Sequence, residues 1–356
     1  MTSAGAVAAI SIAALRHNVR LIRDRVSPAE LLAVVKDDAY GHGLDPVLDV
    51  LLEEGVSRFG ALDLSGALRV RERAPGAMVF AWVFDHGDDL AEPVSAGIDI
   101  GVTDAPTLER VASAVRARGL GPALVHLKLD TGLHRAGALP EDWDGFVSRA
   151  AELQRSGVVS VRGLWTHLAE ESDDDDGRSI AEYLAAVEVA RAHGIRGALC
   201  HVAASAAAYE RADARFDMVR VGAFLYGIAP GSGIGPAQLG LHPVMTLRAP
   251  VTGIRQASGL RLAEVTLGGA AGILADAAGS AMVAIGGVRY PVAAVEPHRV
   301  LIDVGVGEVS VGAIVTLFGD GTSGEPTLQE WADGMGTIGE EIVTRLAAWI
   351  PRVTVT

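Results

Sequence analysis

Four residues that could do chemistry stand at the ends of short apolar runs. Lys36 closes the run 31–36, and His167, His201 and Arg220 lie at or near the ends of three later runs. An amine at the end of an apolar strand is partly desolvated, which favours its neutral, nucleophilic form. Singly, each residue has a simpler explanation, because strand-end lysines often extend along apolar surface and many histidines are structural. Together they predict a covalent site built around a Lys36 Schiff base.

Small residues near the same positions suit a phosphate group. The segment 204–208 (ASAAA) opens a helical stretch and carries the Ser205 hydroxyl, and the segment 221–223 reads VGA. Phosphate oxygens accept hydrogen bonds from backbone N–H groups and hydroxyls where no bulky side chain intervenes. These two segments therefore predict the phosphate end of a cofactor site.

The elements that must position these residues alternate along the first two thirds of the chain. Amphipathic helical stretches such as 104–119 and 178–194 separate apolar runs that predict strands. Eight such runs occur, at residues 31–36, 59–62, 78–84, 99–102, 124–130, 161–168, 198–203 and 218–222. Eight strands separated by helices predict an α/β fold of the (β/α)₈ TIM-barrel type, with the active site at the C-terminal strand ends. An open doubly wound sheet shares the alternation and is the second interpretation.

The residue composition and pattern of the sequence change after Pro230. Short runs rich in Val and Gly follow, with a helical stretch near 328–350 and a final VTVT. This pattern predicts a separate all-β domain. We therefore expect a barrel over residues 11–230, and a β domain formed by residues 1–10 and 231–356. The acidic run 171–176 is expected to be a solvated loop.

Composition restricts the class of protein. The 356 residues carry a formal net charge of −14, which argues against nucleic acid and against a polybasic membrane anchor. The single cysteine excludes a disulfide within the chain. We find no signal-peptide pattern and no apolar stretch long enough for a membrane span, and expect a cytoplasmic protein that acts on a small molecule.

Five motifs carry a specific resemblance. AVVKDDAYGHG, KLDTGLHRAG, GLWTHLAEESD, CHVAASAAAY and DMVRVGAFLYGI resemble motifs of the bacterial alanine racemase family, in the same order and spacing. The resemblance implies a homodimeric enzyme that uses pyridoxal 5'-phosphate and acts on an amino acid. It also implies that Lys36 carries the cofactor as a Schiff base and serves as one of two racemase bases.

The resemblance assigns the phosphate to one group of residues. It implies that Tyr40 and Ser205 hold the phosphate, together with backbone groups of Gly222 and Ala223.

A second group is assigned to the cofactor ring and the substrate. By the resemblance, Arg220 faces the pyridine nitrogen and keeps it unprotonated, because a guanidinium does not give up its proton. His201 orients Arg220, and His167 packs on the ring. Arg135 steers the substrate carboxylate, and Lys128 falls where the family often has a modified lysine.

The sequence departs from the family pattern at several places. The lysine motif, usually Lys-Ala-Asn, is Lys36-Asp37-Asp38, and the segment with the second catalytic base, a tyrosine supplied across the dimer interface, has no counterpart between ASG and LRLAEV. Three later motifs lose their characteristic residues. Their positions are occupied here by Gly268–Gly272, by Pro297-His298-Arg299 and by Glu340.

Three interpretations of function stay open. The first is a pyridoxal-phosphate enzyme of altered chemistry at Cα, such as decarboxylation, aldol cleavage, elimination or one-sided protonation, because a two-base racemase needs a group on each face. The second is an amino-acid racemase whose opposing base is a substitute, for which His298, or its neighbour Glu296, is a candidate. The third is a homologue that binds the cofactor without catalysis, although the persistence of Lys36, Tyr40 and Arg220 argues against it.

Overall fold

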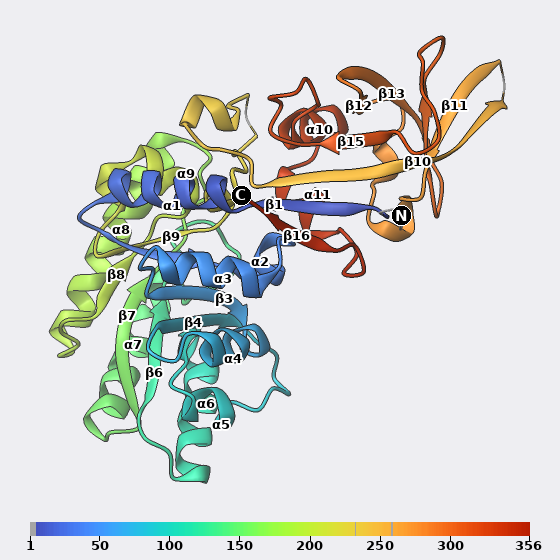
Figure 1. The fold of residues 1–356 in the computed structure, drawn as a ribbon. Coiled ribbons are helices and arrows are strands. Elements are labelled where there is room, and N and C mark those ends of the chain that lie inside the picture. The colour runs from blue at the N-terminus through green and yellow to red at the C-terminus, as the bar shows by residue number, and fades with distance from the viewer. Residues whose placement is uncertain (1–4, 232, 258) are drawn as a thin grey trace. The chain divides into compact units, whose positions relative to one another are not determined.

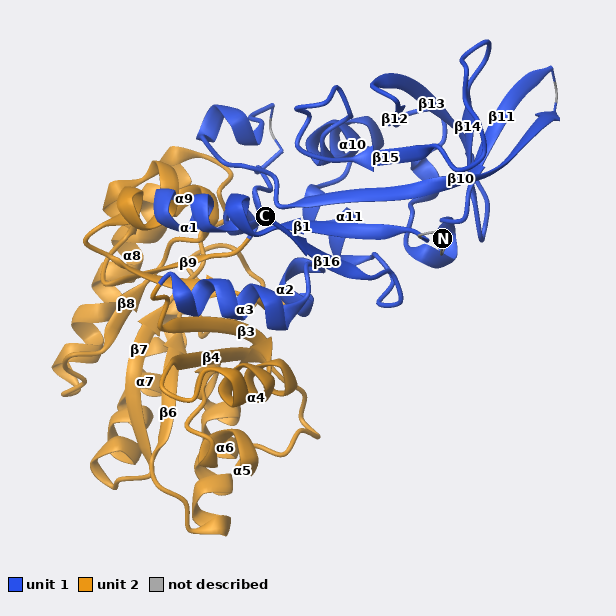
Figure 2. Ribbon diagram, viewed as in Figure 1, with its two compact units in different colours: residues 1–21, 37–54, 223–356 blue, residues 22–36, 55–222 orange. Residues whose placement is uncertain are grey.

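The computed structural model describes residues 5–231, 233–257 and 259–356. The chain divides into two compact units, coloured separately in Figure 2. The barrel unit comprises residues 22–36 and 55–222, and the second unit comprises residues 1–21, 37–54 and 223–356. Within the described part, no helix is both long and apolar enough to span a membrane.

The barrel unit is built on eight parallel strands (Figure 1). They are β2 (Glu30–Val34), β3 (Arg58–Asp63), β4 (Met78–Val83), β5 (Asp99–Val102), β6 (Ala123–Lys128), β7 (Val159–Trp165), β8 (Leu199–His201) and β9 (Met218–Val221). Each coincides with one of the eight predicted runs. Backbone hydrogen bonds from Asp217 N to Cys200 O and from Arg220 N to Ala203 O, both 3.1 Å, join β9 to β8. The sheet therefore closes, which confirms the barrel over the open sheet.

Helices follow the barrel strands, and three of them, α4, α6 and α8, begin at polar caps. They are α4 (Leu64–Arg73), α5 (Ala91–Ser95), α6 (Ala105–Arg118), α7 (Pro140–Arg155), α8 (Asp173–Ala192) and α9 (Ser205–Glu210). In α6, the Asp104 carboxylate accepts a hydrogen bond from Thr107 N at 2.7 Å, and Gly119 ends the helix in a left-handed conformation. Such caps set where the connection to the next strand begins.

The acidic run 171–176 was expected to be a solvated loop, and this expectation is wrong. Most of the run forms the first turn of α8. Ser172 caps the helix, and four carboxylates at its start interact favourably with the positive end of the helix dipole. Asp176 is buried and accepts a hydrogen bond from Glu170 N at 3.2 Å. Acidic residues that follow a serine are thus a helix-start signal as much as a loop signal.

The second unit contains a mainly antiparallel sheet. Its strands are β1 (Val7–Ser11), β10 (Met245–Ala257), β11 (Leu260–Val265), β12 (Met282–Ile285), β13 (Val288–Val295), β14 (Val300–Asp303), β15 (Ile314–Phe318) and β16 (Arg352–Val355). Strand β1 pairs with β10 and with β16, so both ends of the chain join this sheet. The predicted all-β domain is confirmed, and residues 7–11 pair within its sheet.

The helical elements of the second unit are short apart from α1. They are α1 (Ile12–Val26, whose last turn lies in the barrel unit), the left-handed turn α2 (Lys36–Tyr40, whose first residue lies in the barrel unit), α3 (Leu44–Glu53), α10 (Leu328–Met335) and α11 (Gly339–Thr344). Helix α10 starts with a capping box: Thr327 Oγ1 accepts from Glu330 N at 3.1 Å, and Glu330 Oε2 accepts from Thr327 N at 2.6 Å. The predicted helical stretch near 328–350 is therefore two short helices.

Candidate active site

Lys36 stands where the chain leaves the first barrel strand. Val35 N donates to Gly60 O at 2.8 Å, which fixes the end of β2 in the barrel. The next four residues, Asp37–Tyr40, all have left-handed backbone angles, with φ between 53° and 56°. This conformation costs a non-glycine residue roughly 1–2 kcal/mol. A run of four is therefore strained, and strain of this kind accumulates at functional sites.

His42 holds the left-handed turn together. Its Nδ1 lies 2.8 Å from Tyr40 O and 3.0 Å from Ala39 O, so this nitrogen carries a proton and donates to both carbonyls. The ring is buried, and burial lowers the His42 pKa to about 4, which leaves the imidazole neutral. At Gly41, a Cβ would lie 2.3 Å from Val343 O, so only glycine fits. The sequence analysis treated His42 as part of a motif and assigned it no role.

Arg220 is the most heavily bonded cation of the barrel unit's site. Its Nη1 donates to His201 O at 3.0 Å and lies 3.1 Å from His201 Nδ1. Its Nη2 donates to the carbonyl oxygens of Thr166 (2.9 Å) and Val202 (2.8 Å) and lies 3.1 Å from His167 Nδ1. Burial lowers the Arg220 pKa to about 10, so the guanidinium stays charged at neutral pH. The predicted contact between His201 and Arg220 is present.

Positive charge surrounds His167 in the barrel unit. Burial lowers the His167 pKa to about 2, with further contributions from the charges of Arg220, Arg135, Lys128 and Lys36. The ring is therefore neutral, and the structure brings these predicted residues together.

Lys128 is buried and packs on an aromatic ring. Its Nζ lies 4.8 Å from the centroid of Trp165. Burial, with the charges of Arg135 and Arg220, lowers the Lys128 pKa to about 8. An amine with this pKa is partly neutral at physiological pH. The chain contains two lysines, Lys36 and Lys128, and both lie at this site.

Two residues that were not predicted from the sequence extend the site inward. His126 Nδ1 lies 2.8 Å from His201 Nε2, and His126 Nε2 lies 3.1 Å from Asp99 Oδ1. Both residues belong to predicted strands and were counted only as strand residues. The available signal was a charged or titratable residue inside a run that is otherwise apolar.

The predicted phosphate residues fall in both compact units. In the barrel unit, Gly222 N donates to Ser205 Oγ at 3.2 Å, so the two segments with small residues lie side by side. In the second unit, Ala223 continues the chain from Gly222, and Tyr40 is buried with its ring 5.0 Å from that of Tyr226. Burial raises the Tyr40 pKa, and the charge of Glu340 adds to the shift.

His298 differs from these buried groups because its side chain is exposed. It is exposed in the second unit, between β13 and β14. Its neighbour Glu296 forms ion pairs with Arg255 at 3.2 Å and with Arg299 at 3.1 Å. Since Glu296 is occupied by two arginines, His298 is the better of the two candidate acid–base groups.

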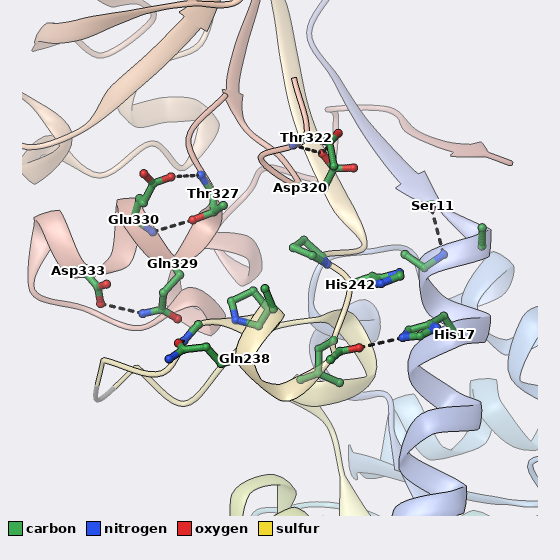
Figure 3. Close-up of a pocket in the computed structure, with 18 of the residues that line it drawn as sticks. Ser11, His17, Gln238, His242, Asp320, Thr322, Thr327, Gln329, Glu330 and Asp333 are labelled. Atoms are coloured by element: carbon green, nitrogen blue, oxygen red, sulfur yellow. Dashed lines mark hydrogen bonds between the residues drawn. The ribbon is translucent and has the colours of Figure 1, made fainter. Parts of the chain in front are cut away.

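A cavity of about 900 Å³ lies wholly within the second unit (Figure 3). The rings of His17 and His242 stack there at 3.9 Å, and His17 Nε2 lies 2.8 Å from Gly240 O. The lining also includes small and apolar residues, with acidic and amide side chains among them: Asp320, Gln329, Glu330 and Asp333. The described lining includes neither of the two lysines, so the covalent chemistry predicted from the sequence belongs to the barrel.

Comparisons with known proteins agree with this geometry. The family profiles "Alanine racemase, N-terminal domain" and "Alanine racemase, C-terminal domain" match residues 10–230 and 245–354. The alanine racemase of Salinispora tropica is 38% identical to this chain, and the match covers 96% of each chain. The alanine racemase of Streptomyces coelicolor is also 38% identical, and the match covers 98% of this chain and 95% of the relative. The crystal structure of alanine racemase from a D-cycloserine-producing Streptomyces lavendulae matches with a TM-score of 0.95 and 32% identity, covering 100% of this chain and 98% of the other. The chain belongs to the alanine racemase family.

Proposed function

We propose that this chain is a pyridoxal-phosphate enzyme that exchanges the Cα proton of a small amino acid, with alanine racemisation as its reaction. The observation that carries the proposal is the buried Arg220 guanidinium, held by His201 and His167 in the same unit as Lys36. The relatives named alanine racemase support the choice of reaction.

The residues of the barrel unit fit this cofactor. Within the described residues, Arg220 makes its hydrogen bonds through Nη1 and Nη2, which leaves Nε as a donor for an acceptor such as a ring nitrogen. A guanidinium does not release its proton, so the ring nitrogen would stay unprotonated. The Ser205 hydroxyl and the Gly222 N–H would hold the phosphate, and Lys36 Nζ would provide the covalent attachment. Bound there, pyridoxal phosphate supplies an electron sink that acidifies the Cα proton of the substrate.

The other side chains bind, orient or move protons. Lys36 Nζ would take the Cα proton on one face of the substrate and return it. His167, neutral because of burial and the surrounding cations, would pack on the ring without adding charge. Arg135, which is exposed, would steer the substrate carboxylate. Tyr40 and the backbone of Ala223 would complete the phosphate site.

Racemisation also requires a proton donor on the face of the substrate opposite Lys36. The sequence has no tyrosine between Tyr226 and Tyr290 and none after Tyr290, where the family's second base is expected. We propose that His298 of a second copy takes this place, since an imidazole can both accept and donate a proton. This requires a homodimer, which light scattering of the purified chain would show.

One-sided chemistry is the second candidate function, and the same missing tyrosine favours it. With Lys36 alone, a proton would return to one face, and decarboxylation, aldol cleavage or elimination would become competing outcomes. Decarboxylation would release carbon dioxide, and aldol cleavage would release an aldehyde.

Borohydride reduction tests attachment of the cofactor. Because the chain has only two lysines, reductive labelling with pyridoxal phosphate has two side-chain amines to modify, Lys36 and Lys128. We expect a pyridoxyl group on the Lys36 peptide, retained in Lys128→Ala and lost in Lys36→Ala. A label on Lys128 alone, or no uptake of the cofactor, would overturn the proposal.

Proton exchange in heavy water tests the reaction. L-Alanine and D-alanine are incubated separately with the loaded protein, and NMR follows loss of the Cα proton while chiral chromatography follows the enantiomer. Exchange with inversion supports racemisation. Exchange with retention of configuration supports one-sided chemistry, and no exchange with any small amino acid indicates a binding protein.

The role of His298 is tested by His298→Ala against His86→Ala. His86 is also exposed but lies in the barrel unit between β4 and α5. We expect His298→Ala to abolish racemisation and to leave exchange from the Lys36 face, with His86→Ala unchanged. Racemisation at the wild-type rate in His298→Ala would exclude His298 as the second base.

A further inference from the structure

Four polar side chains form one hydrogen-bonded chain through the interior of the barrel unit. They come from four different strands: Asp99 from β5, His126 from β6, His201 from β8 and Arg220 from β9. The three links measure 3.1 Å from Asp99 Oδ1 to His126 Nε2, 2.8 Å from His126 Nδ1 to His201 Nε2, and 3.1 Å from His201 Nδ1 to Arg220 Nη1. All four residues are buried, and the largest exposed fraction among them is 5%, at Arg220.

The direction of every proton in this chain follows from its two ends. A guanidinium can only donate, so His201 Nδ1 must accept from Arg220. Burial and the neighbouring Arg220 charge lower the His201 pKa well below its ordinary value, so the neutral ring carries its single proton on Nε2. That proton is donated to His126 Nδ1. His126 then carries its own proton on Nε2 and donates to Asp99, which as a carboxylate can only accept.

The opposite direction is excluded by the same contacts. If His126 donated through Nδ1, His201 would accept on Nε2 and carry its proton on Nδ1. Two donors, Arg220 Nη1–H and His201 Nδ1–H, would then face each other at 3.1 Å. In a buried site this arrangement loses a hydrogen bond and cannot be repaired by water. The Arg220 guanidinium therefore fixes the tautomer of His201, and the Asp99 carboxylate at the far end accepts the proton that the same direction places on His126 Nε2.

The surrounding residues hold the two rings in place. A Cβ at residue 163 would lie 2.1 Å from His126 Nδ1, so Gly163 provides the space for this ring. Trp165 stacks on His201 with a centroid distance of 5.7 Å and an interplanar angle of 6°. Phe80 contacts both histidines, at 4.7 Å from His126 and 5.7 Å from His201. The barrel thus fixes the rings as well as their protons.

We infer that Asp99 and His126 are positioning residues: His126, oriented by Asp99, accepts the Nε2 proton of His201 and so holds the His201 ring, and through it Arg220, as an oriented donor toward the cofactor ring. The inference rests on the proposed function for the identity of the ligand that Arg220 meets. The chain itself exists without that ligand. Both residues act through His201, and neither would touch substrate or cofactor.

Side-chain NMR of the full-length protein tests the proton positions directly. With ¹⁵N-labelled histidine, the cofactor-free and the loaded protein should both show His126 and His201 as neutral rings protonated on Nε2. His126→Phe and His201→Phe assign the signals. An Nδ1-protonated His201, or an imidazolium at either position, would overturn the inference whether or not the protein binds pyridoxal phosphate.

Substitutions at Asp99 separate positioning from structural support. Asp99→Asn keeps an acceptor oxygen and should retain the His201 tautomer and near-normal racemisation. Asp99→Val removes the acceptor and should alter the His201 signals and lower racemisation roughly tenfold or more, as loss of a partner that orients a functional histidine does elsewhere. Gly163→Ala, which displaces the His126 ring without changing any titratable group, should behave like Asp99→Val.

Val125→Ala is the matched control. Val125 is buried in the same strand as His126, and its side chain is on the opposite face because successive residues alternate. This variant should lower thermal stability and leave the His201 signals and the absorption spectrum of the loaded enzyme unchanged. If Asp99→Val and Val125→Ala change activity and spectra equally at matched stability, Asp99 is structural only and the inference fails. Loss of cofactor binding in the wild type would instead overturn the proposed function.

Discussion

Two clusters of charged residues in this molecule have similar hydrogen-bond lengths and very different surroundings. In the barrel unit, Arg220 is 5% exposed and makes contacts of 2.8–3.1 Å to two histidines and three carbonyl oxygens. In the second unit, Arg255 and Arg299 pair with Glu264 and Glu296 at 3.0–3.2 Å, with both arginine side chains more than 40% exposed.

Burial, and not distance, decides what each cluster does. Exposed ion pairs contribute little to stability, because water and salt screen them and the side chains lose freedom. A buried cation has no water to replace a lost partner, so its contacts are both strong and necessary. The barrel cluster is therefore fixed before any ligand arrives. The exposed cluster, which includes the neighbours of His298, is therefore expected to tolerate substitution.

Replacing Lys36 by Ala should give the largest effect on activity. The only other lysine, Lys128, also ends a barrel strand, but its amine packs on Trp165. We expect Cα proton exchange to fall by roughly 10³-fold or more, because both the covalent attachment and a general base are lost. Heavy-water exchange measures it. Retention of most of the exchange would contradict the assignment of the site to the barrel.

Replacing Arg220 by Met should give the largest effect on stability. Three backbone carbonyls, those of Thr166, His201 and Val202, would lose their donor inside the barrel. We expect a loss of about 3 kcal/mol or more in the free energy of unfolding, measured by urea denaturation of the cofactor-free protein. A loss below about 1 kcal/mol would show that water enters the site, and would remove the contrast between the two clusters.

His42 should make stability depend on pH. Its pKa is about 4 in the folded chain against an ordinary value of 6.5, so between these values the unfolded chain binds one more proton. Stability from this residue is therefore full above pH 6.5 and declines as the pH falls toward 4. His167 and His201, also neutral through burial, should add to the decline.

The variant His42→Asn isolates this contribution. The Asn amide can donate to the carbonyls of Ala39 and Tyr40 but cannot take up a proton. We expect a shallower loss of stability between pH 6.5 and pH 4, smaller by one proton, in urea titrations at several pH values. His86→Asn, at an exposed histidine, should leave the slope unchanged. Equal slopes for His42→Asn and wild type would mean that His42 is charged in the folded turn.

The barrel could be predicted from the sequence because its signal is local. Each strand is a short apolar run next to an amphipathic helix, and all eight fall where that alternation places them. The left-handed turn after Lys36 could not, because it depends on His42 being buried and on Gly41 meeting Val343, some 300 residues later in the chain.

The site residues that could be predicted from the sequence also have a local signal. Lys36, His167, His201 and Arg220 stand at strand ends, where barrel enzymes place functional groups. Asp99 and His126 join this group only through contacts 27 and 75 residues apart in sequence. A single sequence does not show which inward-facing strand residues meet across a barrel. The acidic start of α8 was misjudged because charge alone does not distinguish a loop from a capped helix end.

Glu340 should weaken cofactor binding slightly. Its charge contributes to the raised pKa of Tyr40 in the same unit, so a phosphate held by Tyr40 would meet the same negative charge. We expect Glu340→Gln to lower the dissociation constant of pyridoxal phosphate about threefold, a size typical of partly screened charges. Glu341→Gln is the control, because Glu341 pairs with Arg345. An unchanged affinity in Glu340→Gln would remove Tyr40 from the phosphate site.

Replacing Arg299 by Met should give the smallest effect. Its contacts with Glu264 and Glu296 are as short as those of Arg220, yet its side chain is 46% exposed. We expect the free energy of unfolding to change by less than about 1 kcal/mol in urea denaturation, with little dependence on pH. Paired with Arg220→Met, this variant separates burial from distance as the cause of the difference between the clusters.

A loss in the free energy of unfolding for Arg299→Met as large as that for Arg220→Met would mean that the exposed face around Arg299 is covered in solution. A second copy of the chain would then be its first candidate cover, because His298, the proposed second base, is the adjacent residue.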